Sequence, residues 1–311
     1  MSSKKILTIF GVTGQQGGSV VQTILKTPAL QAKYTLRGVT RDTSKPAAQE
    51  LVKLGVDLVR ANLDDPASLN KALAGSHGVF AVTNFWETMD AAQETQQGRN
   101  IVDASLSTGV NHLVISTLPN VSKLTNSTLN VPHFDSKAAI DDYAESVRGD
   151  KLNVTYFQPP FFLQNFESMI NKAQDGSYSI NLPIDPAARV PMTDIVADAG
   201  KWVAGIFEAG AAANGKTVQA VSFWTDLQSF SSQLSAATGK KVIYNNVPAE
   251  VFKSFLPEPI ADEYTENMKF IDQYSYYGKN SEKQQPQSNQ FLLKGAKLAT
   301  VSSFAPTLKL Q

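Results

Sequence analysis

Hydrophobic and polar positions alternate between two periodicities along the first half of the chain. Short apolar runs rich in β-branched residues predict buried strands, and after most of them apolar residues recur at the three- and four-residue spacing of helices. The predicted strands are the segments 4–10, 34–41, 56–62, 77–85, 110–119 and 151–159. The predicted helices are the segments 18–30, 46–55, 65–75, 90–109 and 134–147.

This alternation predicts an α/β protein of the Rossmann type, with a doubly wound parallel sheet and right-handed crossovers. Such sheets bind ligands beyond the carboxyl ends of their strands. After the sixth strand the pattern loosens, with short strands expected over 218–223 and 240–247 and a flexible surface loop over 278–289. We therefore expect a Rossmann domain over residues 1–159 and a smaller mixed α+β C-terminal lobe over residues 160–311, partly interleaved with it.

The overall composition narrows the functions to consider. The chain has 311 residues, with 28 Lys and Arg against 28 Asp and Glu, so no broad basic face for nucleic acid is expected. It contains no cysteine, which excludes a disulfide framework and a cysteine nucleophile. Three dispersed histidines give no metal-ligand spacing, so no metal is expected. No apolar run reaches about 18 residues, which predicts a soluble intracellular protein without a membrane span.

The stretch between the first predicted strand and the first helix, FGVTGQQGGSV, is rich in glycine. Gly11, Gly14 and Gly17 recur at three-residue intervals, and Gly18 follows directly. A dinucleotide pyrophosphate binds to exposed backbone N–H groups at a helix N-terminus, so side chains must be absent there. A tight turn alone explains one or two of these glycines but not four in this register, which favours a dinucleotide site.

The end of the second predicted strand bears on which dinucleotide is bound. NAD sites place Asp or Glu there to accept from the ribose 2′-hydroxyl, whereas NADP sites offer Arg to the 2′-phosphate. Here Arg41 holds that position, and Lys45 follows within reach of the same phosphate. The two cations predict an NADP(H) site, unless they are solvated loop charges, and Asp42 would either repel the phosphate or cap the turn.

Several motifs, in combination and order, resemble those of the NmrA-like family of atypical short-chain dehydrogenase/reductases, and within it the members described as NADPH sensors. The matching segments are GVTGQQGGSV, VTRDTSK, VTNFWE, HFDSK, PPFFLQNF and VPMTDIVADAG, which extend along nearly the whole chain. The resemblance implies a Rossmann domain with a small C-terminal lobe, and NADP(H) as the cofactor. It implies cofactor contacts at Gly11, Thr13, Gly14, Gln15, Gln16, Gly17, Arg41, Lys45, Asn62, Leu63, Thr83, Asn84, Phe85 and Lys137, with Phe162, Leu163, Gln164 and Asn165 lining the nicotinamide end.

The residues expected to handle a proton depart from the Ser and Tyr-x-x-x-Lys set of a typical short-chain dehydrogenase. Lys137 is present, His133 stands where the Tyr would be, and Ser116 ends the fifth predicted strand near the usual Ser. Because positions four apart share a helix face, His133 and Lys137 can point at one site. Either His133 acts as a general acid, with Lys137 tending to lower its pKa, or it only packs at the helix start while Lys137 binds the cofactor.

Aromatic residues gather in two of these motifs. Phe85 and Trp86, together with the segment 161–169, either form a pocket wall above the nicotinamide or belong to the core. Gln164 and Asn165 lie within the second motif and supply the few polar groups that a binding pocket needs.

These features favour an NADP(H)-binding protein that senses the NADPH/NADP⁺ ratio and regulates a protein partner, such as a transcription factor or an enzyme, with little turnover of its own. The alternative is an NADPH-dependent oxidoreductase that reduces a small carbonyl or enone metabolite, as in secondary metabolism. A third interpretation is a scaffold whose glycine loop no longer binds a dinucleotide. A cytoplasmic location is expected, with a nuclear location and a homodimer left open, and neither nucleic acid nor membrane is expected as a partner.

Overall fold

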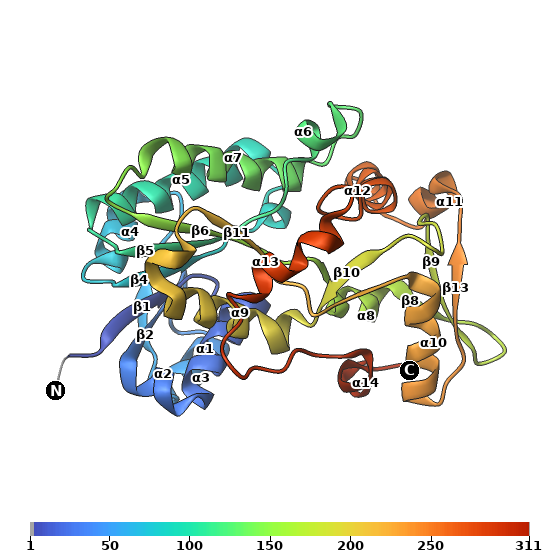
Figure 1. Ribbon diagram of the computed structural model, residues 1–311, viewed down its shortest axis with the longest axis horizontal. Helices are drawn as coiled ribbons and strands as arrows, with labels where there is room; N and C mark the ends of the chain where they lie inside the picture. Colours follow the sequence, from blue (N-terminus) through green and yellow to red (C-terminus); the bar gives the residue numbers. More distant parts are fainter. Residues whose placement is uncertain (1–2, 311) are drawn as a thin grey trace.

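A parallel sheet with helices on both faces forms the larger part of the molecule. The computed structural model describes residues 3–310, and in that part of the chain the large sheet has seven strands in the order β11-β6-β5-β4-β1-β2-β3, all parallel (Figure 1). These strands are β1 (Lys5–Ile9), β2 (Tyr34–Thr40), β3 (Asp57–Arg60), β4 (Gly78–Ala81), β5 (His112–Ser116), β6 (Asn153–Gln158) and β11 (Lys216–Gln219). The order reverses between β1 and β4, the switch point where such sheets bind ligands. The predicted Rossmann-type α/β fold is confirmed.

Two layers of helices cover the sheet. One layer consists of α4 (Pro66–Leu73), α5 (Ala91–Ser107) and α7 (Pro132–Val147) (Figure 1). The other consists of α1 (Gln15–Lys26), α2 (Pro28–Lys33), α3 (Pro46–Lys53) and α9 (Ile195–Ala209). Both α9 and β11 follow β6 in the sequence, so the chain returns to the sheet after it has entered the smaller lobe.

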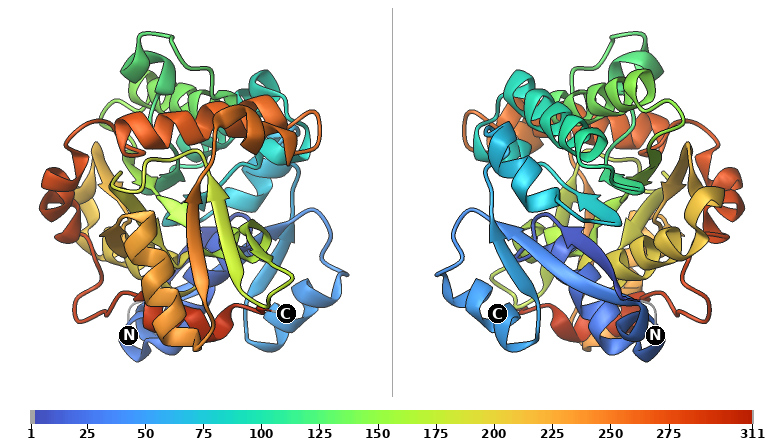
Figure 2. Two further views of the ribbon diagram at one scale, coloured as in Figure 1. Left: turned by 90° about the vertical axis from the view of Figure 1, so that its right-hand side faces the viewer. Right: turned by 90° about the vertical axis from the view of Figure 1, so that its left-hand side faces the viewer.

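The smaller lobe is built from short strands and helices (Figure 2), and aromatic side chains contribute to the core between them. One of its sheets contains β7 (Phe161–Phe162), β10 (Val190–Thr193) and β12 (Phe223–Thr225), and another contains β8 (Ile170–Lys172), β9 (Tyr178–Leu182) and β13 (Val242–Asn246). Both sheets mix parallel and antiparallel pairs. The helices here are α8 (Phe166–Met169), α10 (Leu227–Thr238), α11 (Ala249–Ser254), α12 (Ala261–Tyr274) and α14 (Val301–Phe304), while the short α6 (Val121–Thr125) precedes α7.

Two predicted helices differ from the observed ones at proline residues. The helix expected over 18–30 begins at Gln15 and ends at Lys26, because Thr27 is extended and Pro28 opens α2 as its first residue. Proline has no N–H to donate within a helix but fits the first helical position. For the same reason the helix expected from residue 134 begins at Pro132.

The segment expected as a flexible loop over 278–289 instead forms η4 (Ser281–Gln284) and α13 (Gln285–Asn289). The backbone N–H of Gln219 donates to Oγ of Ser288 at 3.0 Å, and Nε2 of Gln285 donates to the Gln219 carbonyl at 3.0 Å. Gln219 lies in β11, at the edge of the large sheet. The polar composition therefore serves to cover a sheet edge, which would otherwise expose unpaired backbone groups.

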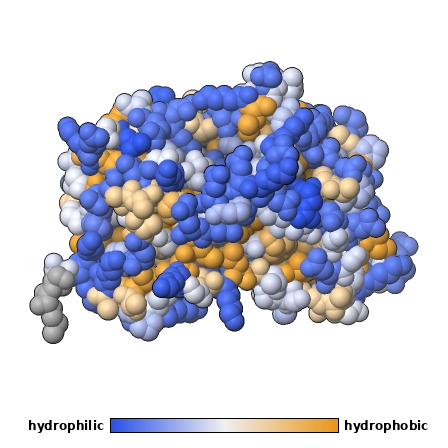
Figure 3. Space-filling view, viewed as in Figure 1, coloured by the Kyte–Doolittle hydropathy of each residue, from blue (hydrophilic) through white to orange (hydrophobic). Residues whose placement is uncertain are grey.

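The outer surface is largely hydrophilic on the face shown in Figure 3, with smaller apolar patches toward the lower middle of the view. Across residues 3–310, no helix combines the length and apolar character that crossing a membrane requires.

Helix α9 is pressed against α1 at Gly200. The Gly200 N–H donates to Oγ of Ser19 at 2.9 Å, and a Cβ added at Gly200 would lie 2.2 Å from the Ser19 carbonyl oxygen. Two residues along, Trp202 is fully buried in the core that α9 shares with α1 and the sheet. The absence of a side chain at Gly200 is what allows the two helices to approach this closely.

The α1–α9 contact predicts a sharp difference between two Gly→Ala variants. Gly200→Ala should lower the free energy of unfolding by roughly 2–3 kcal/mol, because the added methyl meets a backbone oxygen that cannot move aside. Gly18→Ala is the matched control: its Cβ would lie 3.6 Å from the nearest atom, so higher helix propensity should leave stability unchanged or raise it by up to about 1 kcal/mol. Urea unfolding measures both, and equal stabilities would contradict this account of the contact.

His112 is the first residue of β5 in the large sheet and is almost fully buried. The Thr155 hydroxyl donates to the Ala213 carbonyl at 2.8 Å, so it accepts from Nε2 of His112, also at 2.8 Å. Burial, with a smaller effect from His77, lowers the pKa of His112 to about 4. The ring is therefore neutral and structural at neutral pH.

This buried histidine predicts an acid-sensitive fold. Because the pKa of His112 is lower in the folded state than in the unfolded state, the unfolded chain binds the proton first as the pH falls below about 6.5, and stability decreases down to pH about 4. Between pH 7 and pH 5 the loss from this residue should be about 2 kcal/mol. His112→Gln, which retains an amide donor, should lack this part of the pH dependence in urea unfolding at the two pH values. If both proteins lost the same stability between pH 7 and pH 5, this pH dependence could not be assigned to His112.

Candidate functional site

The glycine turn brings the start of α1 to the switch point of the sheet. Gly11 has a φ of +58°, and the Gly14 N–H donates to the Gly11 carbonyl at 2.8 Å. A Cβ at Gly17 would lie 2.4 Å from that same carbonyl oxygen. Gly11 and Gly17 are thus required by the turn and by its packing against the helix. A Cβ at Gly14 would make a tight contact of 3.2 Å with the same oxygen, whereas Gly18 has room for a side chain. Packing at this turn therefore does not require a glycine at position 18.

The N-terminus of α1 presents unpaired backbone donors. Gly14 is the N-cap, no side chain in the described part of the chain caps the helix, and its first turn contains no acidic residue. The first N–H groups of a helix lack intrahelical partners, and they lie at the positive end of the helix dipole. Thr13, Gln15 and Gln16 adjoin these groups in the sequence. The turn thus has the donor set and the close backbone approach that a diphosphate needs.

A cleft of about 340 Å³ begins beside this turn and extends to the smaller lobe. Among the residues predicted from sequence, it is lined by Gln15, Gln16, Thr83, Asn84, Phe85, Ser116, His133, Lys137, Phe162 and Asn165. It is also lined by residues not included among the predicted contacts, among them Tyr264, Asn267 and Met268 of α12 and Tyr276, which follows that helix. The ends of β4, β5 and β6 thus meet one face of a helix from the other lobe.

The cations expected to read the 2′-phosphate lie outside this cleft, after β2. Arg41 is exposed and forms an ion pair with Glu87. Lys45 is the exposed N-cap of α3, with no side-chain cap hydrogen bond. Oδ1 of Asp42 accepts from the Ser44 N–H at 2.9 Å, and hydrogen bonds from Ser44 lower the pKa of the Asp42 carboxyl. Asp42 thus caps the turn, which is one of the two roles expected for it.

Four further predicted contacts lie at positions that pack or form hydrogen bonds within the protein. Asn62 and Leu63 form the turn after β3, where the Leu63 carbonyl accepts from Nδ2 of Asn100 at 2.8 Å. Leu163 is fully buried in the lobe core. Nε2 of Gln164 donates to Asp194 at 2.8 Å, and its Oε1 accepts from the Ile195 N–H at 3.2 Å, so this side chain fixes the start of α9.

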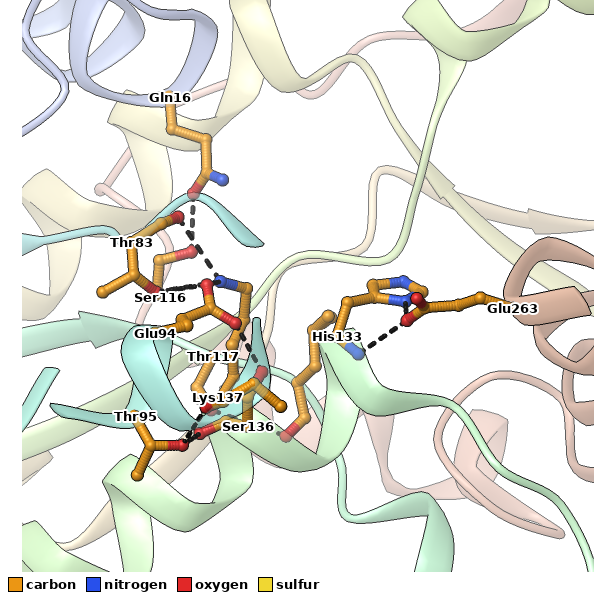
Figure 4. Close-up of polar contacts among 12 residues, drawn as sticks. Gln16, Thr83, Glu94, Thr95, Ser116, Thr117, His133, Ser136, Lys137 and Glu263 are labelled. Atoms are coloured by element: carbon orange, nitrogen blue, oxygen red, sulfur yellow. Dashed lines mark hydrogen bonds and ion pairs between the residues drawn. The ribbon is translucent and has the colours of Figure 1, made fainter. Parts of the chain in front are cut away.

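The ammonium group of Lys137 is held by a buried carboxylate, Glu94 (Figure 4). Lys137 also donates to Oγ1 of Thr83 at 2.9 Å, and the Thr83 hydroxyl donates to Glu94 at 2.7 Å. Ser136 donates to the second oxygen of Glu94, whose side chain is only 1% exposed. Sequence reasoning missed Glu94, although it lies on the face of α5 that also carries the buried Gly98 and Ile101, and a carboxylate on a buried face is a signal.

Ser116 is tied to the glycine turn by a side-chain contact. Its Oγ donates to Oε1 of Gln16 at 2.7 Å (Figure 4). The contact joins the carboxyl end of β5 to the first turn of α1. Both side chains face the cleft, so either can exchange this bond for one to a ligand.

His133 is held by a second buried carboxylate, Glu263 of α12 (Figure 4). One oxygen of Glu263 accepts from the His133 backbone N–H at 2.7 Å and lies 2.6 Å from Nδ1. Burial is the main cause that lowers the pKa of His133; Lys137 also lowers it, whereas Glu263 and Glu94 raise it. A carboxylate accepts, so the neutral ring carries its hydrogen on Nδ1, and Nε2 is an acceptor. The neutral ring therefore has no free N–H for the general-acid role weighed from the sequence.

Aromatic rings pack around this histidine. Trp86 lies with its ring centroid 4.8 Å from that of His133 and 5.0 Å from that of Tyr264. Phe85 and Phe134 lie at 5.9 Å and 4.7 Å from the same imidazole. Phe134 is fully buried, whereas Trp86 is partly exposed in the cleft. The aromatic wall expected at this site thus includes Trp86 and is completed by α12.

Comparison with known proteins finds relatives that match most of the chain. The model of the NmrA-like family matches residues 3–305. The NmrA-like oxidoreductase ptmS of Penicillium ochrochloron is 30% identical over 91% of this chain and 85% of that protein, and an NmrA-like family protein of Dictyostelium discoideum is 30% identical over 81% and 84%.

Solved structures show the same fold. NmrA, a negative transcriptional regulator crystallised with NAD, has a TM-score of 0.82 at 18% identity, covering 98% of this chain and 95% of that one. The triphenylmethane reductase of Citrobacter sp., crystallised with NADP(H), has a TM-score of 0.76 at 21% identity, covering 97% and 99%. From the match of the family model over nearly all of its length, the chain belongs to the NmrA-like family.

Proposed function

We propose that the protein is an NADP(H)-dependent oxidoreductase acting on a small substrate in the cleft. The observation that carries the proposal is the cleft itself, which runs from a helix N-terminus suited to a diphosphate to an aromatic pocket with ionisable side chains. A pocket that is mostly apolar with a few convergent polar groups is typical of small-molecule sites. Several curated relatives, ptmS among them, are named as oxidoreductases, which supports the same conclusion.

The dinucleotide fits the residues at the start of the cleft. The free N–H groups of α1 would hold the diphosphate, and the absence of a side chain at Gly17 lets the start of this helix pack against the Gly11 carbonyl. Arg41 would release Glu87 and bind the 2′-phosphate in its place. Phe162 and Asn165 would line the nicotinamide end. When bound, the cofactor supplies or accepts a hydride, and the protein's own part is to orient the substrate and handle the proton.

A redox-sensing regulator is a second candidate, favoured by the surroundings of Lys137. Its charge is compensated by Glu94, and no Tyr stands four residues before it. Such a lysine suits cofactor binding better than proton transfer. NmrA itself, which shares this fold, is described as a negative transcriptional regulator. The two candidates differ in whether any substrate is turned over.

The ion pair between Arg41 and Glu87 predicts opposite effects from two substitutions. Arg41→Ala should weaken NADPH binding about ten- to a hundredfold, through loss of a charge-assisted hydrogen bond to the 2′-phosphate, and leave NADH binding nearly unchanged. Glu87→Gln should strengthen NADPH binding several-fold, because the guanidinium is no longer paired with a carboxylate. Calorimetric titration with NADPH and NADH measures both. Equal losses for NADPH and NADH in Arg41→Ala would argue against an NADP site.

The buried pair of Lys137 and Glu94 predicts that the two residues must be replaced together. Lys137→Met alone leaves a buried carboxylate unpaired and should lower the free energy of unfolding by about 3–5 kcal/mol. Adding Glu94→Gln should restore most of this stability. Thermal unfolding compares the two variants with the wild type, and no recovery in the double variant would contradict the pairing.

The folded double variant then tests the proposed function. NADPH consumption is followed with a panel of carbonyl, enone and quinone substrates, and NADP⁺ reduction with a panel of alcohols. An oxidoreductase should turn over at least one of them, and its kcat/KM for the cofactor should fall about ten- to a hundredfold in the double variant, because the charge-assisted hydrogen bond from Lys137 to the cofactor is lost. Tight NADPH binding without turnover in either protein would favour the regulator instead.

A further inference from the structure

We propose that the inner face of α12 recognises a substrate hydroxyl on a flat apolar body, and that His133, positioned by Glu263, accepts the proton of that hydroxyl. The inference rests on the proposed function, because in the same reaction a hydride is transferred to NADP⁺. It assigns a substrate class, an alcohol, and a direction, oxidation.

Helix α12 directs a set of residues at helical spacing toward the cleft. Glu263 and Tyr264 are followed one turn later by Asn267 and Met268, and positions four apart lie on the same helix face. Tyr264, Asn267 and Met268 line the cleft, and Glu263 bonds to His133 just behind it. The helix therefore adds a polar and apolar surface to a cavity whose other walls come from the Rossmann strands.

His133 offers the cleft an acceptor. Its Nδ1–H and backbone N–H are both taken by Glu263. Across residues 3–310, Nε2 has no hydrogen-bond partner, and the ring lines the cleft. Glu263 fixes the tautomer and ring orientation, and it would stabilise the imidazolium once a proton arrives, as the carboxylate of a His–carboxylate pair does. Glu263 is thus a positioning residue that acts through His133.

Asn267 offers a second acceptor. Its side chain is only 9% exposed and lines the cleft, and within the described residues its Oδ1 is buried without a hydrogen-bond partner. An unpaired buried amide oxygen costs about 1–3 kcal/mol, so such groups are normally satisfied in the functional state. A ligand hydroxyl can donate to Oδ1 and also accept from Nδ2 of the same amide, whereas a ligand carbonyl can only accept. Two acceptors in one cleft therefore favour a ligand that donates.

The remaining walls define the body of the ligand. Trp86 and Tyr264 lie 5.0 Å apart between ring centroids, and Met169, Met268 and Phe161 complete an apolar surface. Aromatic and thioether side chains favour flat, polarizable groups. A planar or arylated alcohol thus matches both the apolar walls and the two acceptors.

The proton and electrons balance for an alcohol. The O–H bond breaks and its proton passes to Nε2 of His133, while the C–H bond breaks and its hydride passes to NADP⁺, which gives a carbonyl and NADPH. The imidazolium then releases the proton to solvent. At neutral pH the ring is ready to accept, because burial and Lys137 lower the pKa of His133 more than Glu263 and Glu94 raise it.

Nitrogen NMR of the histidine rings tests the proton acceptor without any ligand. His133→Gln identifies the signals of this residue among the three histidines. We expect an unprotonated Nε2 and a hydrogen-bonded Nδ1–H at neutral pH. The opposite tautomer would overturn the inference, because Nε2 would then be a donor.

The same spectra test the positioning role of Glu263. In Glu263→Gln the ring keeps an oxygen acceptor but loses the negative charge, so His133 should protonate at a lower pH than in the wild type. Asp262→Asn is the matched control, because Asp262 is exposed on the same helix and pairs only with Lys253 in the described chain. An unchanged titration in Glu263→Gln would remove Glu263 from the proposal.

A pair of probes tests the substrate class. Methyl naphthyl carbinol and methyl naphthyl ketone have the same carbon skeleton, but only the carbinol donates a hydrogen bond, and calorimetry of the NADP⁺-treated protein compares them. We expect the carbinol to bind about tenfold more tightly, and this preference to fall in Asn267→Leu but not in Asp262→Asn. Equal binding of both probes, or binding of neither, would overturn the assignment.

The design separates this inference from the proposed function. Failure of NADP⁺ itself to bind would refute the oxidoreductase, while the preference for carbinol over ketone and the tautomer of His133 would still decide the role of α12. Conversely, turnover of a carbonyl with no preference for the carbinol would support the oxidoreductase and refute the role of α12.

Discussion

The contact of helix α1 with the turn that precedes it is the constraint on which the rest of the structure depends. Gly17 lies over the Gly11 carbonyl so closely that any side chain would clash. This contact aims the uncapped N-terminus of α1 at the reversal in strand order between β1 and β4. Helix α9 then crosses α1 at Gly200, again with no room for a methyl group. Because α9 lies between two segments of the smaller lobe in the sequence, the contact also connects that lobe with the cofactor end.

Two buried carboxylates organise the far end of the cleft, and they act in different ways. Glu94 neutralises Lys137 and accepts from Thr83 and Ser136, so it holds its neighbours in one arrangement and leaves little charge toward the cleft. Glu263 takes the hydrogen bonds of a single histidine and leaves the opposite ring nitrogen open to the cleft. Glu94 therefore completes a hydrogen-bond network within the protein, whereas Glu263 leaves His133 with an acceptor nitrogen in the cleft.

The sequence was sufficient to predict what depends on local pattern. Strand and helix periodicity predicted the α/β class, and glycine spacing located the turn at the switch point, because both are determined within a few residues. It did not reveal Glu94 or Glu263, since the first contacts α7 from α5 and the second reaches His133 across 130 positions of sequence. Leu163 and Gln164 show the same limit: the motif that contains them faces the cleft only in part, and backbone geometry decides which side chains turn into the core.

The division of the site between two parts of the chain has a consequence for specificity. The groups suited to the dinucleotide come from the first strands and the glycine turn, whereas α12 supplies Tyr264, Asn267 and Met268 and the carboxylate behind His133. Substitutions on α12 can therefore change the ligand at the aromatic end while the diphosphate contacts stay intact. One fold can thus serve different substrates, because function resides in the site and the scaffold supplies only its position. In the site that we propose, the polar groups of α12 determine what is bound beside the cofactor.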